Sequence, residues 1–172
     1  MHKQNTQHGF TLIELLLYVS LLSLFIGSAV LLAWNVIYGG IQSKIQQDVN
    51  HAIRFASKRI AYEVRNATAI TSVSPTSLCL ASASPTYNPT RIYTTAGTLR
   101  IGWGGNVSDC STTTNDALLI NPDLSVTVNF TDLSVPALSE NIEYELTVQS
   151  LGERSEWNYQ ENVRGSVELR AN

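Results

Sequence analysis

The sequence predicts an α+β protein in which a long N-terminal α-helix packs on a C-terminal antiparallel β-sheet. An apolar run extends from Phe10 to Tyr38. From Ile41 to Ala67 the apolar residues instead recur every three or four positions, as they do on one face of a helix. After Thr68 the composition changes to Ser, Thr, Asn, Gly and Pro around short β-prone segments. We therefore expect a first helical half at 10–38, an amphipathic helix at 39–68 and a β-rich head at 69–172.

The apolar run is long enough to cross a bilayer, and it contains one carboxylate. Crossing about 30 Å of hydrocarbon takes roughly 20 helical residues. Apart from tyrosines, Glu14 is the only ionisable residue of the run. A charged side chain at the bilayer centre costs roughly 2.5 to 3.5 kcal/mol on insertion scales, so such groups are usually paired or functional. The next basic residue along the chain is Lys44, too far along a helix to pair with Glu14. We therefore expect a partner from elsewhere.

Cleavage after Gly9 would supply that partner. It would leave a free ammonium on Phe10, one helical turn from Glu14. A polar leader holding Lys3, followed by Gly9-Phe10-Thr11-Leu12-Ile13-Glu14 and a long apolar helix, resembles the type IV prepilins and pseudopilins. The resemblance implies that residues 1–9 are a leader, that a membrane prepilin peptidase cuts between Gly9 and Phe10, and that Phe10 is then N-methylated.

Two other interpretations of the N-terminus are less favoured. A secretory signal peptide places its small residues after the apolar core, whereas Gly9 precedes it. A plain single-span anchor with an incidental glutamate near its end remains an alternative. Lys3 and the leader histidines favour a cytoplasmic leader and an extracytoplasmic head. The resemblance implies the same orientation in the inner (cytoplasmic) membrane, followed by entry into a filament.

The sequence also predicts local features of the helix and the head. Gly39-Gly40 should bend or loosen the helix, which should end between Asn66 and Thr68. Loops are expected at Ser82–Pro89 and Gly102–Asn115. Strands are expected at Arg91–Thr95, Thr98–Trp103, Ala117–Ile120, Ser125–Phe130, Glu143–Val148 and Val163–Leu169. The apolar stripe of the helix should cover the buried face of this sheet.

Cys79 and Cys110 are the only cysteines, and both fall in the extracytoplasmic head. On the oxidising side of a membrane they can form a disulfide. Two buried thiols are the alternative. Without histidines nearby, they make a poor metal site.

The residues of the head argue against catalysis and against nucleic-acid binding. Residues 69–172 contain no histidine, so we expect no hydrolytic triad and no enzyme activity. The head aspartates lack the spacing of a calcium loop, so no cofactor is expected, although the resemblance keeps calcium open because some pseudopilins bind it. With five arginines against eleven acidic residues, the head carries a charge of −6.

Residues 39–68, with five basic and two acidic residues, carry +3. Arg54, Lys58, Arg59 and Arg65 supply most of that charge, either as a solvated face or as contacts between subunits.

These features predict a structural subunit of a type IV pilus or a type II secretion pseudopilus. The resemblance implies that Phe10 and Glu14 act in assembly, and that the partners are the prepilin peptidase, other pilin or pseudopilin subunits and an inner-membrane assembly platform. Many major pilins have a proline where this chain has Leu31, and no proline occurs before Pro75, which favours a minor subunit. The alternative is a membrane-anchored recognition module whose Tyr87, Tyr93 and Trp103 bind a surface ligand, a secreted substrate or DNA. Exposed, clustered aromatic rings would favour that alternative.

Overall fold

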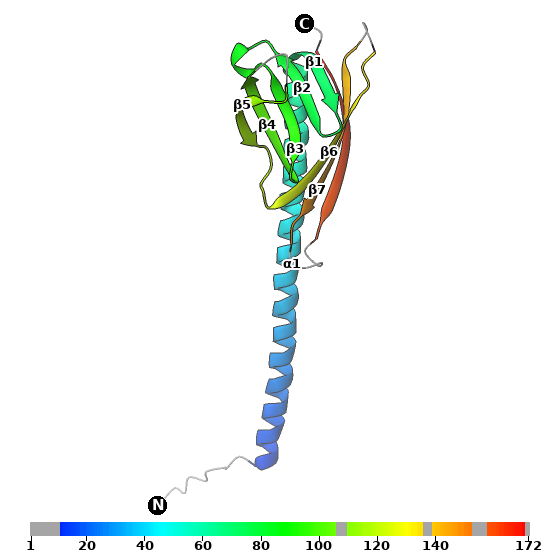
Figure 1. The fold of residues 1–172 in the computed structure, drawn as a ribbon. Coiled ribbons are helices and arrows are strands. Elements are labelled where there is room, and N and C mark those ends of the chain that lie inside the picture. Colours follow the sequence, from blue (N-terminus) through cyan, green and yellow to red (C-terminus); the bar gives the residue numbers. More distant parts are fainter. Residues whose placement is uncertain (1–10, 106–109, 136–138, 153–157, 171–172) are drawn as a thin grey trace, which may run out of the picture. The chain divides into compact units, whose positions relative to one another are not determined.

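The computed structural model describes residues 11–105, 110–135, 139–152 and 158–170, and it confirms the predicted α+β fold. Within these ranges one long helix is followed by eight strands and one short 3-10 turn (Figure 1). The elements are α1 (Leu12–Asn66), β1 (Ala67–Ser74), β2 (Ser77–Ser82), η1 (Pro85–Tyr87), β3 (Thr90–Thr95), β4 (Thr98–Gly105), β5 (Thr113–Leu118), β6 (Leu124–Asp132), β7 (Asn141–Ser150) and β8 (Gln160–Glu168). The chain divides into two compact units, Met1–Gln42 and Ser43–Asn172.

In the second unit, α1 buries the predicted apolar stripe. Its buried side chains recur every three or four residues; they are Val49, Ile53, Ala56, Ile60 and Val64. Together with buried side chains of both sheets they form one hydrophobic core. The helix ends at Asn66, within the predicted interval. It continues through Gly39 and Gly40 without interruption, so the predicted loosening is not found. A Cβ at either glycine would meet nothing within 4 Å, so no packing contact requires glycine there.

The strands form two antiparallel sheets rather than the single sheet that we expected. The first has the order β1-β2-β3-β4-β5 and the second the order β6-β7-β8. Neighbours in sequence are therefore neighbours in each sheet, which short turns permit. Between β3 and β4, the turn residues Ala96 and Gly97 both have positive φ, 48° and 74°, as expected for a tight hairpin turn that follows the strand twist.

Backbone hydrogen bonds connect one edge of the second sheet to the first. The amide N–H of Val126 on β6 donates to the carbonyl of Gly97, at 2.7 Å, and that of Phe130 donates to Pro75, at 3.0 Å. Gly97 and Pro75 lie in the turns of the β3–β4 and β1–β2 hairpins, so two hairpin turns cover the free edge of β6. On β1, the Ile70 amide donates to Oε2 of Glu140, at 2.8 Å. These bonds hold the two sheets of the head together.

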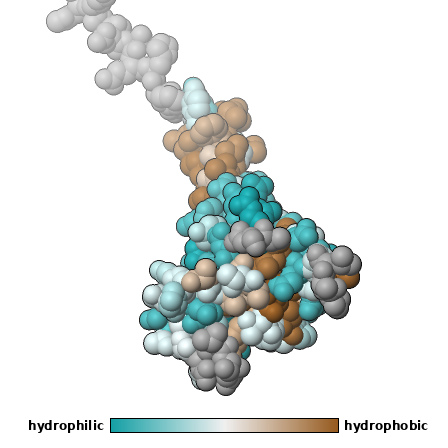
Figure 2. Space-filling view, turned by 90° about the horizontal axis from the view of Figure 1, so that it is seen from above, coloured by the Kyte–Doolittle hydropathy of each residue, from teal (hydrophilic) through white to brown (hydrophobic). Residues whose placement is uncertain are grey.

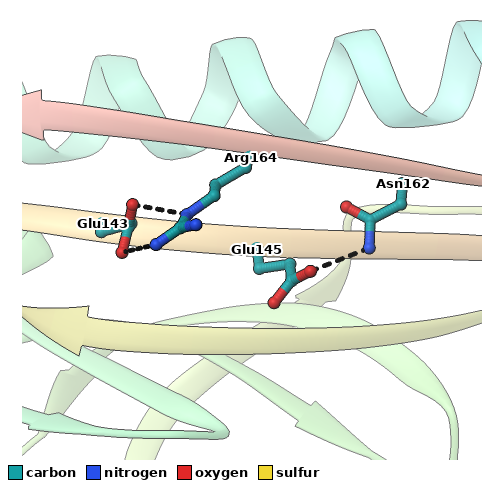
Figure 3. Close-up of polar contacts among 4 residues, drawn as sticks. All are labelled: Glu143, Glu145, Asn162 and Arg164. Carbon is teal, nitrogen blue, oxygen red and sulfur yellow. Dashed lines mark hydrogen bonds and ion pairs between the residues drawn. The ribbon is translucent and has the colours of Figure 1, made fainter.

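The second sheet has one buried and one polar face. Inward side chains alternate along β6 and β7, as predicted; they are Leu124, Val126, Val128 and Phe130 on β6, and Ile142, Tyr144, Leu146 and Val148 on β7. Outward side chains pair across β7 and β8 (Figure 3). There Arg164 makes two hydrogen bonds with Glu143, at 2.6 and 2.8 Å, and Asn162 donates to Glu145, at 3.0 Å.

The structure corrects several predicted boundaries in the first sheet. Strands β1 and β2 were not predicted at all. The loop expected at Gly102–Asn115 is too long, because β4 continues to Gly105 and β5 begins at Thr113. The strand expected at Ala117–Ile120 lies at Thr113–Leu118 instead. Within the predicted loop Ser82–Pro89, residues Pro85–Tyr87 form η1.

Candidate functional site

The first half of α1 has an apolar surface that is exposed in the structure. Its most apolar stretch of 18 residues has a mean hydropathy of 2.4, and none of that stretch is buried (brown in Figure 2). Within the described residues, α1 is the one helix long and apolar enough to cross a membrane. Because long exposed apolar surfaces are rare on soluble monomers, this half requires lipid or other protein around it.

Glu14 lies in the first turn of this helix. The backbone N–H groups of Glu14 and Leu15 donate to the carbonyl of Thr11, at 3.1 and 3.2 Å, so the helix begins directly after Thr11. The carboxylate is thus at the positive end of the helix dipole. This role of Thr11 at the helix start was not predicted, although a Thr three residues before a Glu is a recognised helix-start pattern. Gly9 and Phe10 lie outside the described residues.

The serine hydroxyl groups of the apolar segment are hydrogen-bonded within the helix. Ser20 donates to the carbonyl of Leu17, Ser23 to that of Ser20, and Ser28 to that of Phe25, at 2.8 to 2.9 Å. A hydroxyl without a partner would be costly in hydrocarbon, where no water is available. These local bonds make the segment compatible with an apolar environment despite its serines.

Cys79 and Cys110 form the disulfide that the sequence suggested. Cys79 lies on β2, 1% exposed, and its Cα is 6.2 Å from that of Cys110, within the usual range for a bridge. Arg91 supports the same region, because its guanidinium donates to the Ser111 carbonyl at 2.7 Å and to the Ser77 hydroxyl at 2.8 Å. The bridge thus connects β2 to the segment that precedes β5.

The three aromatic residues of the recognition alternative do not form one cluster. Tyr87 and Trp103 are neighbours, with ring centroids 6.4 Å apart, and both border a cleft of about 240 Å³. Tyr93 is instead covered by the Arg91 guanidinium, 4.5 Å from its ring centroid. The alternation of β3 places Tyr93 and the buried Ile92 on opposite faces of the sheet. No continuous aromatic surface for a ligand results among these residues.

Glu63 is a partly buried carboxylate that lines the same cleft. Its side chain is 15% exposed, and an oxygen lies 2.6 Å from a guanidinium nitrogen of Arg59. Burial raises the pKa of Glu63, and the charge of Arg59 opposes that shift. Arg59 is also within 5.6 Å of the Tyr62 ring centroid, so this arginine is held by the helix itself. The Glu63 carboxylate on this cleft therefore already has a cationic partner from its own helix.

The other basic residues predicted on this helix are exposed. Arg54, Lys58 and Arg65 all project from the second half of α1, and Lys58 and Arg65 line a groove beside the end of β8. Within the described residues there is no group of three or more His, Cys, Asp or Glu side chains that could hold a metal ion.

Comparison with known proteins gives a match at the N-terminus. The family model of the prokaryotic N-terminal methylation motif matches residues 4–30. No curated protein and no solved structure matches the chain. The matched residues include the Gly9/Phe10 junction, Glu14 and residues 12–30 of the exposed apolar helix. This motif, together with the exposed apolar helix that it enters, supports a type IV pilin or pseudopilin.

Proposed function

We propose that the chain is a structural subunit of a type IV pilus or a type II secretion pseudopilus, and a minor rather than a major one. The observation that carries this proposal is an uncovered apolar helix with a single carboxylate in its first turn, inside a methylation motif. A helix of this kind has two suitable surroundings, a bilayer before assembly and the packed helices of a filament afterwards. The proposed role is structural, without catalysis by this chain.

Processing would prepare the N-terminus for assembly. The motif implies a prepilin peptidase, which would cut between Gly9 and Phe10 and methylate the new amino group. The resulting cation would attract Glu14 of an adjacent subunit. In an apolar surrounding the attraction between two such charges is strong when they are close, while its net contribution to stability is small once the desolvation of both charges is counted. Glu14 would therefore set the axial register between subunits.

The same features support a cellular location for the chain before and after assembly. Before assembly the chain would be a single-span protein of the inner membrane with its head outside the cytoplasm. An assembly platform in that membrane would then pass it to the filament with other pilin or pseudopilin subunits. The helix continues from Leu12 to Asn66 and contains no proline, with Leu31 where many major pilins have one. This supports a minor subunit, because the proline marks the place at which the helix of those major pilins opens.

The proposal is tested by replacing Glu14 with leucine. Glu14→Leu should be inserted and cut normally, since it removes a charge from the apolar segment, but its incorporation into sheared filaments should fall at least tenfold. The matched control is Leu15→Ile, a change of similar size at the next position that retains the carboxylate. Normal incorporation of Glu14→Leu, quantified by immunoblot of filament and membrane fractions, would refute the register role.

A second experiment tests the processing site. Gly9→Val should leave the precursor uncut in the membrane, because a bulky residue replaces the small one before the cut. The mass of the wild-type chain should correspond to a methylated N-terminus at Phe10. A wild-type chain that begins at Met1 would contradict the proposed processing.

A further inference from the structure

Two grooves of opposite charge run along α1 in the head. One, the basic groove, has a volume of about 620 Å³ and lies between Lys58, Ala61, Tyr62 and Arg65 of α1 and Leu169 and Arg170 after β8. Glu168 also lines it, so its three cations and one anion give a formal charge of +2. The Tyr62 side chain is 59% exposed, which leaves an aromatic ring at the mouth of this groove.

The other, the acidic groove, lies beside an earlier part of the helix. It has a volume of about 450 Å³ and is lined by Asp48, His51, Ala52 and Phe55 of α1 and by Ile120 and Asp123 from the segment between β5 and β6. Its two aspartates give a formal charge of −2 with His51 neutral. The Phe55 side chain is 48% exposed, so this groove also carries an aromatic ring at its mouth.

The helix residues of the two grooves repeat with a shift of ten positions. Asp48, His51, Ala52 and Phe55 correspond in spacing to Lys58, Ala61, Tyr62 and Arg65. Ten residues of α-helix advance about 15 Å and fall about 80° short of three full turns. The grooves are therefore displaced along the helix and around it, and they border different β-segments of the head. Two copies arranged head to tail can therefore bring the basic groove of one against the acidic groove of the other.

We propose that the basic groove of one copy of this chain docks against the acidic groove of a second copy. This inference rests on the proposed filament role and specifies a contact between heads within it. The two surfaces are complementary in charge, and a head-to-tail contact between unlike surfaces can repeat along an open helix, which is the symmetry of a filament. Two neighbouring copies suffice, so the contact suits a subunit that is minor in number.

The side chains at both grooves are available for this contact. In the described part of the chain, no ion pair involves Asp48, Asp123, Lys58 or Arg65, whereas Arg59, Arg100 and Arg164 are already paired. Tyr62 and Phe55 supply the large rings that usually anchor an interface, with charges around them. A membrane surface or a nucleic acid would fit the basic groove alone and would leave the acidic groove without a role.

The contact can be tested by cross-linking full-length chains in the cells that make the filament. Two copies with different tags would carry Ala52→Cys, in the acidic groove, and Ala61→Cys, in the basic groove. Both changes are small, and the native cysteines are held in their disulfide. A thiol cross-linker should join the differently tagged copies at least fivefold more than it joins two Ala52→Cys copies. Asn129→Cys, on the exposed face of β6, is the control position and should give no adduct with Ala61→Cys.

Charge reversal then tests the complementarity. Asp48→Lys in the copy with Ala52→Cys should lower the adduct about three- to tenfold, the range expected when a few exposed pairs change from attraction to repulsion. Lys58→Glu in the other copy should restore it. A loss without restoration would overturn the charge pairing.

Other outcomes separate this inference from the proposed function. Filaments that contain both copies but no Ala52–Ala61 adduct would overturn the docking and leave the structural role standing. Adducts with a different subunit, identified by mass spectrometry, would overturn the second copy as the occupant. If the wild-type chain is absent from filaments altogether, both proposals fail.

Discussion

Removal of the Cys79–Cys110 disulfide gives a direct test of what stabilises the head. The bridge closes a loop with a sequence separation of 31 residues. By the chain-entropy relation, closing such a loop lowers the entropy of the unfolded chain by about 12 cal/mol/K, or about 3.7 kcal/mol at 25 °C. For a unit of about 130 residues, that loss corresponds to a fall in melting temperature of roughly 10 to 20 °C.

The assay is chemical unfolding of the full chain in detergent, followed by near-ultraviolet circular dichroism. The variant Cys79→Ala/Cys110→Ser should lose about 3 to 4 kcal/mol of unfolding free energy. Because Cys79 is 1% exposed, alanine there also leaves a small cavity, so the wild type with reductant should lose slightly less than the variant. Reductant should not change the variant. A loss below about 1 kcal/mol in both comparisons would refute the loop-closure reasoning.

Three further predictions concern the packing and the charges of the head. Glu140→Ala should destabilise the detergent-solubilised chain by about 1 to 3 kcal/mol in the same unfolding assay, because the Ile70 amide loses its carboxylate acceptor; Glu140→Gln, which keeps an acceptor, is the control. Ile60→Ala should cost about 2 to 5 kcal/mol and Ile60→Val about 0.5 to 1.5, since this side chain is fully buried; equal costs would contradict the packing. Because the pKa of Glu63 is raised, the folded state binds more protons to this group than the unfolded state does. The free energy of unfolding should therefore fall as pH rises from the ordinary pKa of 4.5 to the raised value. A Glu63→Gln variant with the same slope of stability against pH as the wild type would contradict this prediction.

The long helix was predictable because each of its parts carries a strong local signal. The apolar run gives the first half, and the buried stripe of Val49 to Val64 gives the second. Strands β6 and β7 were found for the same reason, since one buried face imposes a strict alternation. These elements depend on a single apolar surface each, and that surface is visible in the sequence.

The first sheet was harder to predict because its strands depend on their partners. Strand β1, with the sequence ATAITSVS, is half exposed and rich in Ser and Thr, so its composition resembles a loop. Gly102 begins the predicted loop, yet it lies within β4. Glycine is required at this position because a Cβ would collide with the side chain of Thr113 on the paired strand. Sheet membership likewise follows from pairing between distant residues, which local patterns do not record.

The candidate site was predictable only in part. The motif from Gly9 to Glu14 is a continuous stretch of chain, so the residues alone are enough to indicate the family resemblance. The two grooves of the head are not local, since each combines helix residues with a segment distant in sequence, such as Asp123 or Arg170. A helical wheel shows only the charges of the helix side, so the walls that turn these charges into grooves appear only in the folded head.

The internally bonded serines of the apolar segment have an energetic consequence for its movement. Ser20, Ser23 and Ser28 keep the same backbone acceptors whether lipid tails or neighbouring helices surround them. Transfer from one surrounding to the other therefore breaks none of these hydrogen bonds and exposes none of these hydroxyls. Because these three serines are unaffected by the exchange, the balance between bilayer and filament depends more on shape, on side-chain contacts and on the charges of Glu14 and of the processed N-terminus. A small difference in those terms is then enough to direct the helix either way.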